Sequence, residues 1–255
     1  MMRDGKENDA PPSGAPHALL VGGSKFRIKR TLMLSVIIPA FNEARTLSGL
    51  LERVIAAPLG KEIIVVDDGS TDETPAILAS YEGRPGLKVI THARNLGKGM
   101  AVRSAIPHIT GEAAIIQDAD LEYDPQDYSR LLEPVAAGTA QVVFGGRRGL
   151  HQSSMVSYVG GRLLSLLADL LYRQQLMDMS TGYKLFDSRL LKSLPLRCTG
   201  FEFCAEVTAR IGKRGIRIHE IPIRYQPRSV AAGKKIRWLD GVVAAWILLK
   251  YRFVD

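Results

Sequence analysis

Short apolar runs alternate regularly with helix-like stretches over residues 32–120 of this 255-residue sequence. The apolar runs predict strands at 33–40, 62–68, 87–92 and 113–120, and the stretches between them have the spacing of amphipathic helices. Strands that are separated by single helices form crossover connections, which require a mainly parallel sheet with helices on both faces. The sequence therefore predicts an α/β fold.

Beyond residue 140 the alternation weakens, although four further elements are expected. Strands are predicted at 141–146 and 216–225, and helices at Met155–Tyr172 and Ile236–Phe253. The first of these helices carries apolar residues on most of its faces. It therefore fits either a core helix or a helix that lies in a membrane interface, and the two interpretations can hold for different faces.

The ends of the chain differ in character from its middle. Residues 1–30 mix acids, prolines and glycines and end in a basic stretch, which predicts a disordered basic leader and not a secretory signal. Residues 31–255 are expected to form one domain, with one half at 31–140 and the other at 141–255. The longest uncharged apolar stretch, Gly241–Leu249, is shorter than the roughly 20 residues of a membrane-spanning helix.

The formal net charge of +8 is distributed unevenly. Residues 31–140 sum to −6, whereas residues 141–255 sum to +11. The total alone would favour nucleic acid or an anionic membrane surface as a partner. Its division along the chain instead indicates an acidic half that needs a cation and a basic half that suits an anionic ligand.

Polar side chains gather where the first four predicted strands end. In a parallel sheet the ligand crevice lies beyond the carboxyl ends of the strands, so these residues are expected to meet there. The clusters, in strand order, are Asn42 and Glu43, Asp67 and Asp68, Arg94 and Asn95, and Asp118 and Asp120.

The pair Asp118 and Asp120 follows a buried apolar strand. Two carboxylates one residue apart can both reach a hard divalent cation, which usually completes its shell with substrate phosphates. Buried carboxylates without a counter-cation would resist joint ionisation, which favours the metal site. The alternative is a solvated turn with a helix N-cap at Asp124.

Two further clusters suit the remaining parts of a nucleotide. Asp67 or Asp68 could accept hydrogen bonds from a base or a ribose hydroxyl, while the next residues form a turn. Arg94 and Lys98 flank a glycine-containing turn at a helix start, which resembles a phosphate cradle; a solvated loop explains that pattern equally well.

Together, the segments SVIIPAFNE, VVDDGSTDET, RNLGKG and QDADLEYDP resemble glycosyltransferase family 2 in wording, order and spacing. The resemblance covers roughly residues 32–253. The later segments GGRR, DMSTGYKLF, GFEFCAEVTARIGKRG and IHEIPIRYQPRSVAAGKKIRW are similar to its polyprenyl-phosphate branch, which contains dolichol-phosphate mannose synthase and dolichyl-phosphate glucose synthase. The resemblance implies a GT-A-type three-layer sandwich, in which an inverting enzyme with Mg²⁺ or Mn²⁺ moves a sugar from GDP-mannose or a UDP-hexose to a polyprenyl or dolichyl phosphate.

The resemblance also implies a role for each matching residue. The expected donor-binding residues are Pro39, Ala40, Asn42, Glu43, Asp67, Asp68, Arg94, Asn95, Lys98, Gln117, Arg228 and Lys235. Asp118 and Asp120 would hold the metal, and Arg147 and Arg162 would bind the acceptor phosphate; these four are the expected catalytic residues. Because a phosphate monoester is already an anion at pH 7, such a transfer needs no general base.

Three other functions remain open at this level. A family 2 enzyme that acts on a saccharide or lipid-linked hydroxyl would need a base, for which Asp178, Glu202 and Glu206 are available. A nucleic-acid binder is disfavoured because basic and aromatic residues do not interleave. A non-catalytic membrane scaffold is disfavoured because both Asp118 and Asp120 are present.

The expected location is the cytoplasmic face of a membrane. Cys198 and Cys204 have neither the spacing of a zinc site nor that of a disulfide framework, which favours a reducing compartment. Many members of the resembled family continue into C-terminal spanning helices, whereas this sequence ends at Asp255. Membrane contact is therefore expected to be peripheral or supplied by a separate membrane protein.

Overall fold

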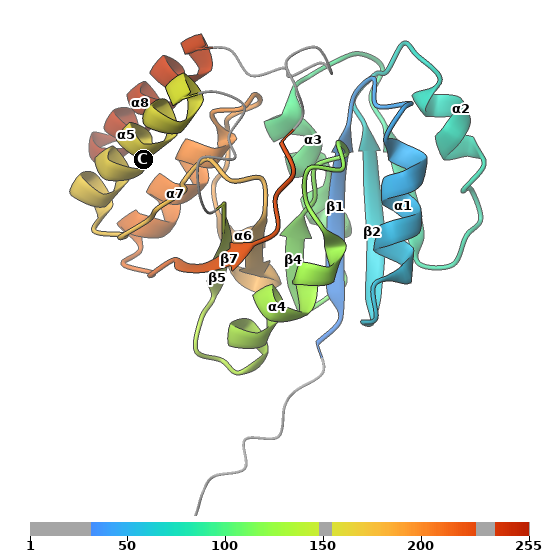
Figure 1. Ribbon diagram of the computed structural model, residues 1–255, viewed down its shortest axis with the longest axis horizontal. Helices are drawn as coiled ribbons and strands as arrows, with labels where there is room; N and C mark the ends of the chain where they lie inside the picture. Colours follow the sequence, from blue (N-terminus) through green and yellow to red (C-terminus); the bar gives the residue numbers. More distant parts are fainter. Residues whose placement is uncertain (1–31, 148–154, 228–237, 255) are drawn as a thin grey trace, which may run out of the picture.

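The computed structural model describes residues 32–147, 155–227 and 238–254. One seven-stranded sheet runs through both halves of the chain in the order β3-β2-β1-β4-β6-β5-β7. Figure 1 labels β1, β2, β4, β5 and β7 of this sheet. The predicted leader at 1–30 and the predicted donor contacts Arg228 and Lys235 lie outside the described residues. The strands are β1 (Leu34–Ala40), β2 (Lys61–Asp67), β3 (Leu87–Thr91), β4 (Ala113–Ile116), β5 (Val142–Arg147), β6 (Lys184–Asp187) and β7 (His219–Ile223).

The sheet is parallel on one side and mixed on the other. β3, β2, β1 and β4 pair in parallel, and β5 pairs in parallel with β7. β6 runs antiparallel between β4 and β5. The expectation of a mainly parallel sheet is therefore confirmed, although the reversed strand β6 was not predicted.

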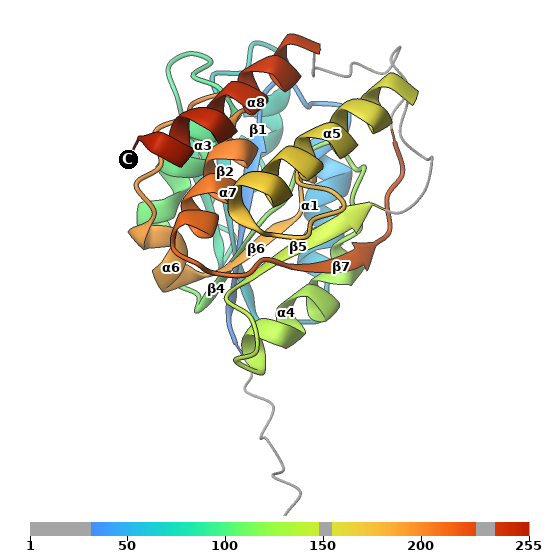
Figure 2. The same ribbon diagram turned by 90° about the vertical axis from the view of Figure 1, so that its left-hand side faces the viewer.

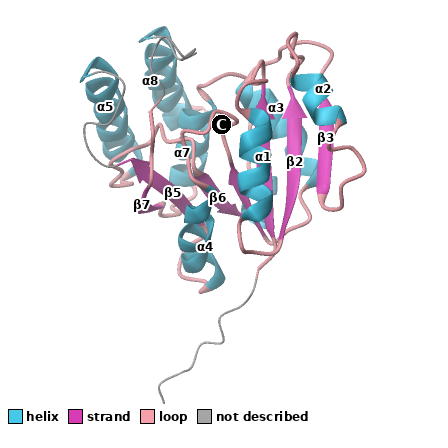
Figure 3. Ribbon diagram, turned by 45° about the vertical axis from the view of Figure 1, so that its right-hand side comes forward, coloured by secondary structure: helices cyan, strands magenta, loops and turns pink. Residues whose placement is uncertain are grey.

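Helices cover both faces of the sheet, so the fold has three layers (Figure 3). One face carries α1 (Leu47–Ala56), α2 (Thr74–Ala79) and α4 (Tyr128–Ala136). The other carries α3 (Lys98–Ala105), α6 (Ser188–Ser193) and α7 (Phe203–Lys213). On this second face α5 (Met155–Tyr172) and α8 (Trp238–Phe253) lie side by side and pack on α7 (Figure 2).

Burial on both faces explains why the central strands are continuously apolar in sequence. Ile37 packs in the core beneath α3, while its neighbour Ile38 packs in the core beneath α1, and both are fully buried. Successive side chains of a strand point to opposite faces, so a strand with helices on both sides needs apolar residues at every position.

The registers of the parallel strands bring their carboxyl ends to one edge. Ala40 at the end of β1 lies opposite Asp67, which in turn lies opposite Thr91 at the end of β3. Ile37 of β1 pairs with Ile116, the last residue of β4. The loops after these strands consequently share one edge of the sheet, as the polar clusters predict.

Candidate active site

Asn42 and Glu43 tie the end of β1 to the turn after β2. The backbone N–H of Asn42 donates to Ser70 Oγ at 3.0 Å, and Asn42 Oδ1 accepts from the N–H of Thr71 at 2.8 Å. Glu43 is largely buried, and its N–H donates to Thr74 Oγ1 at 3.0 Å. Ahead of them, Pro39 is half-buried and Ala40 is buried. These residues lie together at the predicted donor edge.

Asp67 and Asp68 are both buried at the end of β2. Asp67 Oδ1 accepts from the N–H of Ser70 at 3.0 Å and so shapes the turn. Asp68 instead reaches the loop after β3, where its carboxylate accepts from the N–H groups of Leu96 at 2.9 Å and Gly97 at 2.7 Å. Asp68 thus anchors this loop; its contact with a base or ribose stays a prediction.

His92 is part of this anchor, and sequence reasoning missed it. Its Nδ1 lies 2.7 Å from Asp68 Oδ1, and its Nε2 lies 2.9 Å from Ser104 Oγ on α3. A single histidine after a strand has no local pattern that distinguishes it. The chain Asp68–His92–Ser104 fixes the loop that carries Arg94 and Asn95, both of which are exposed.

The loop after β3 also packs against the turn after β2 without space for a side chain. Gly69 has a φ of 71°, and a Cβ there would lie 2.4 Å from the carbonyl carbon of Arg94. Only glycine meets both requirements at low cost. The two predicted donor clusters are therefore in direct backbone contact.

Lys98 and Asp118 form an ion pair across the donor edge. Lys98 Nζ donates to Asp118 Oδ1 at 2.5 Å, and both side chains are mostly buried. Burial alone would lower the pKa of Lys98, but the adjacent carboxylate of Asp118 outweighs it and the pKa is raised. The lysine therefore stays charged beside the first carboxylate of the predicted metal site.

Gln117 lies beneath the site in the core. It is fully buried, its Oε1 accepts from the hydroxyls of Tyr128 and Tyr183 at 2.6 Å each, and its Nε2 donates to Asp118 O at 2.8 Å. These three bonds direct the amide into the core. The structure thus gives Gln117 the role of holding the backbone of Asp118, in place of the predicted contact with the donor.

The residues after β4 suit a cation that takes part of its shell from a ligand. Asp120 Oδ1 accepts from the N–H of Glu122 at 3.2 Å. Gly182 lies so close to Asp118 that a Cβ there would be 2.3 Å from Asp118 Oδ2. Among the described residues no group of three or more His, Cys, Asp or Glu side chains could hold a metal ion. Two carboxylates would provide oxygen ligands, and a diphosphate would have to provide others.

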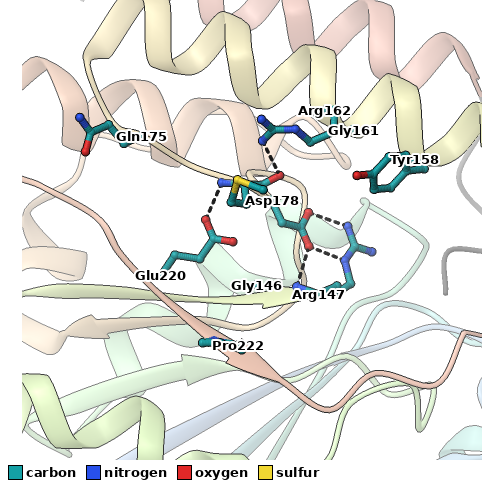
Figure 4. Close-up of a pocket in the computed structure, with 10 residues that line it drawn as sticks. Gly146, Arg147, Tyr158, Gly161, Arg162, Gln175, Asp178, Glu220 and Pro222 are labelled. Atoms are coloured by element: carbon teal, nitrogen blue, oxygen red, sulfur yellow. Dashed lines mark hydrogen bonds and ion pairs between the residues drawn. The ribbon is translucent and has the colours of Figure 1, made fainter. Parts of the chain in front are cut away.

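A pocket of about 520 Å³ lies between α5, β5 and β7 (Figure 4). Arg147 and Asp178 face each other in it through two short bonds: Arg147 Nε lies 2.6 Å from Asp178 Oδ2 and Nη2 lies 2.8 Å from Oδ1. Burial opposes the charge of Arg147, but Tyr123 and Asp178 raise its pKa well above the usual value. The lining residues are Gly146, Arg147, Tyr158, Gly161, Arg162, Gln175, Met177, Asp178, Glu220 and Pro222.

Arg162 enters the same pocket from α5. Its Nη1 donates to the carbonyls of Leu176 and Met177 at 3.1 Å each. Across the pocket Glu220 accepts from the N–H of Met177 at 2.6 Å, and burial raises its pKa. The two predicted acceptor arginines, which are 15 positions apart in sequence, are thus brought together with two acidic residues that reduce the local positive charge.

Tyr123 connects this pocket with the donor edge. Its hydroxyl accepts from the N–H of Gly182 at 2.7 Å, next to Asp118. Burial raises the pKa of Tyr123 first, Arg147 opposes that effect, and the charges of Asp118 and Asp178 add to it. Tyr123 is therefore close to Asp118 of the predicted metal pair and to Arg147 of the predicted acceptor pair, which brings the two predicted sites near each other.

The three candidate bases differ in their surroundings. Glu206 is fully buried and accepts from the N–H groups of Arg197 and Cys198. Glu202 accepts from the N–H groups of Thr199 and Gly200 at 3.2 and 3.0 Å. Of the three, Asp178 alone lines the pocket.

Comparisons with solved structures confirm the GT-A-type α/β fold. Mannosyl-3-phosphoglycerate synthase from Rubrobacter xylanophilus is 22% identical with a TM-score of 0.66, and the match covers 87% of this chain and 73% of that one. Glucosyl-3-phosphoglycerate synthase from Mycobacterium tuberculosis, in complex with Mn²⁺, UDP-glucose and phosphoglyceric acid, is 20% identical with a TM-score of 0.65, covering 88% and 81%.

Two relatives found by sequence comparison are named for polyprenyl-phosphate substrates. An undecaprenyl-phosphate 4-deoxy-4-formamido-L-arabinose transferase from Edwardsiella ictaluri is 33% identical over 212 residues, which cover 81% of this chain and 64% of the relative. A dodecaprenyl-phosphate galacturonate synthase from Rhizobium johnstonii is 27% identical over 215 residues, covering 80% and 62%. The chain thus spans less than two thirds of the length of these relatives. The profile of the family "Glycosyl transferase family 2" matches residues 35–194. The chain belongs to glycosyl transferase family 2.

Proposed function

We propose that this chain transfers a sugar, with inversion, from a nucleotide-sugar to the phosphate of a polyprenyl lipid. The observation that carries the proposal is the pocket with Arg147 and Arg162, placed next to Asp118 through Tyr123 and Gly182. A guanidinium binds phosphate oxygens through a planar fork and keeps its charge, so it suits an anionic acceptor. The substrates named for the two relatives are consistent with this acceptor class.

The donor edge would hold the nucleotide-sugar. Its loops are fixed by Asp67, Asp68 and His92, so they offer a preformed surface to the nucleoside. Lys98 would be free to approach the diphosphate once a divalent cation competes with it for Asp118. A divalent cation, Mg²⁺ or Mn²⁺, bound by Asp118 and Asp120 would neutralise the charge that develops on the leaving diphosphate.

The acceptor phosphate would compete with Asp178 for the fork of Arg147. A phosphate monoester carries about −1.5 to −2 charges at pH 7, so it attracts the guanidinium more strongly than one carboxylate does. Such an oxyanion can attack the sugar directly, and the protein's task is to position two anionic reactants. Arg147 and Arg162 would perform this positioning.

A surface formed by α5 and α8 would lie against the membrane. We call it the α5–α8 face; its exposed apolar residues are Val159, Leu163, Leu166, Leu170, Leu239, Val242, Val243, Trp246, Leu249 and Phe253. Phe253 and Leu170 are 83% and 79% exposed, and the basic residues Lys250 and Arg252 lie near one end. Within the described ranges, the helices are all too short or too polar to cross a bilayer. We infer peripheral contact with a cytoplasmic membrane face; helices of a separate membrane protein are the alternative partner for this surface.

The reaction is tested with purified protein, undecaprenyl phosphate in detergent, Mg²⁺ or Mn²⁺, and a panel of radiolabelled UDP- and GDP-sugars. The expected product is a polar lipid whose label is released by mild acid and resists alkali. The matched control omits the lipid phosphate and supplies undecaprenol at the same concentration. Label transferred equally well to the alcohol would contradict the phosphate acceptor.

A second function is favoured by one observation, the position of Asp178 in the pocket. If the acceptor were a hydroxyl, Asp178 would serve as its base. The undecaprenol control tests this acceptor class for a lipid alcohol, and the Asp178→Asn variant described below tests it for the residue.

A further inference from the structure

The segment at 224–226, which follows β7, lies along the loop after β4. Tyr123 and Tyr225 form an isolated antiparallel bridge, and the N–H of Gln226 donates to Glu122 O at 2.9 Å. The N–H of Arg224 donates to Asp127 Oδ2 at 2.7 Å. The loop that carries Asp120 is therefore fastened by a segment about a hundred residues away in sequence.

Tyr225 joins the donor and acceptor sides through two different parts of its side chain. Its hydroxyl donates to Glu122 Oε2 at 2.7 Å, on the donor side. Its ring lies against the guanidinium of Arg147, with 5.1 Å between the guanidinium carbon and the ring centroid, on the acceptor side. Burial and Glu122 both raise the pKa of Tyr225, so the phenol keeps its proton and remains a donor.

We propose that Tyr225 is a positioning residue that couples the donor carboxylate loop to the acceptor arginine. The inference rests on the proposed function and names a residue to which neither the sequence motifs nor the substrate roles assign a task. Tyr225 acts through its neighbours: it orients Glu122 on one side and Arg147 on the other. It is not expected to touch a reacting atom.

The link to the donor side runs through a short and constrained loop. Glu122 is two residues beyond Asp120, and its N–H donates to Asp120 Oδ1 at 3.2 Å. Leu121 between them has a φ of 61°, a conformation that is uncommon for a residue with a side chain. Displacement of Glu122 therefore changes the orientation of the Asp120 carboxylate.

The link to the acceptor side persists when a ligand arrives. In the structure Asp178 binds the edge of the Arg147 fork, while the ring of Tyr225 contacts the guanidinium in a cation–π geometry. A phosphate that replaces Asp178 would take the edge and leave the ring contact in place. Tyr225 would then continue to set the orientation of Arg147.

Two substitutions separate the two links. Tyr225→Phe removes the hydroxyl and keeps the ring, so the KM for the nucleotide-sugar should rise by about fivefold while the KM for the lipid phosphate changes by less than about twofold. Tyr225→Leu removes both, so both KM values should rise. Tyr81→Phe is the matched control, because Tyr81 donates to Glu52 Oε1 at 3.0 Å on α1 and takes no part in the site; both of its KM values should stay at the wild-type level.

A second measurement does not depend on activity. Hydrogen–deuterium exchange of peptides covering 118–127 should be faster in Tyr225→Phe than in the wild type and unchanged in Tyr81→Phe. Identical KM changes in the Phe and Leu variants, or unaltered exchange at 118–127, would overturn the coupling. Absence of transfer by the wild-type protein would instead overturn the proposed function, and the exchange experiment would still decide whether Tyr225 fastens the loop.

Discussion

Asp67 and Asp68 at the donor edge have a different kind of partner from Asp178 in the acceptor pocket. Asp67 and Asp68 accept hydrogen bonds from backbone N–H groups and so hold loops in place. Asp178 binds mainly the guanidinium of Arg147 and so neutralises a charge that a ligand would use. The comparison shows that the loops of the donor edge after β2 and β3 are held by backbone hydrogen bonds, whereas the fork of Arg147 is neutralised by a side chain that would have to give way if an anion entered.

The burial of the Arg147–Asp178 ion pair is compatible with the replacement of Asp178 by another anion. A buried ion pair recovers much of its desolvation cost only while both charges are matched, and removing one partner costs about 3–5 kcal/mol. The side chains of Arg147 and Asp178 are only 14% and 6% exposed, so Arg147 needs an anion at its fork at all times. The proposed lipid phosphate would meet that need in place of Asp178.

The largest effect is expected from a substitution at the proposed metal-binding pair on the donor side, Asp118 and Asp120. Asp118→Asn removes one charged ligand for a cation and the partner of Lys98, so transfer should fall by at least about a thousandfold. The rate is measured with Mg²⁺ and with Mn²⁺, and again with EDTA. Asp240→Asn on α8 is the control and should keep the wild-type rate. Full activity of the wild type in EDTA would show that no metal is needed.

On the acceptor side, Arg147→Lys should lower kcat/KM for the lipid phosphate by about a hundredfold, because an ammonium group cannot form the planar fork. The KM for the donor should stay nearly constant.

The substitution Asp178→Asn distinguishes the two candidate reactions. A fall in the transfer rate of about tenfold or less fits a phosphate acceptor, whereas a fall of several hundredfold identifies a general base. Both variants are compared with the wild type by thermal unfolding, since Asp178→Asn leaves the charge of Arg147 without its partner and Arg147→Lys removes the two-bond fork.

The substitution Gln117→Leu tests whether Gln117 supports the backbone beneath the donor edge. The hydroxyls of Tyr128 and Tyr183 would lose their common acceptor in the core, so the free energy of unfolding should fall by about 2–4 kcal/mol. Denaturant titration measures the change. The control substitution Gln126→Leu, at an exposed position in the segment after β4, should change the free energy of unfolding by less than about 0.5 kcal/mol. Equal stability of the two variants would remove the supporting role of Gln117.

A smaller effect is expected from loosening the donor loop alone. Asp68→Asn weakens the bonds to Leu96 and Gly97, which should raise the donor KM by about tenfold and leave the acceptor KM unchanged. Ser104→Ala removes only the outer end of the His92 chain and should raise the donor KM by less than about threefold. If the acceptor KM rose together with the donor KM in these variants, the donor loop and the acceptor pocket would not be independent.

Local patterns predicted the parallel half of the fold well. Buried strands covered on both faces are continuously apolar, and the polar residues that follow β1, β2, β3 and β4 lie at one edge of the sheet, as their pattern predicts. β6 was not predicted because it has only four residues and runs antiparallel to β4 and β5. An antiparallel strand needs no crossover helix, so the sequence lacks the strand–helix alternation that indicates the parallel strands. Such a strand is determined by its partners and not by its own pattern.

The sequence predicted which site residues lie near one another, but not the hydrogen bonds that each of them makes. Gln117, Asp68 and Arg147 are predicted to lie near the ligands, and that stays a prediction; what the sequence did not indicate is that they bind Tyr183, Gly97 and Asp178 within the chain. Tyr225 and Glu122 are 103 positions apart, and nothing near either residue in the sequence indicates their contact. Hydrogen bonds between distant segments depend on the packed fold, which local periodicity does not describe.

The reversed strand β6 has a consequence for the order in which the protein can be made. A ribosome delivers the acidic half first, but the edge of β4 cannot be covered until β6 emerges, and Tyr183 reaches Gln117 from 66 positions away. The carboxylates of Asp118 and Asp120 therefore acquire their final setting late, after most of the nascent chain has been synthesised. Until β6 has been synthesised, the nascent chain exposes the unpaired edge of β4. An unpaired strand edge can pair with another chain and so promote aggregation.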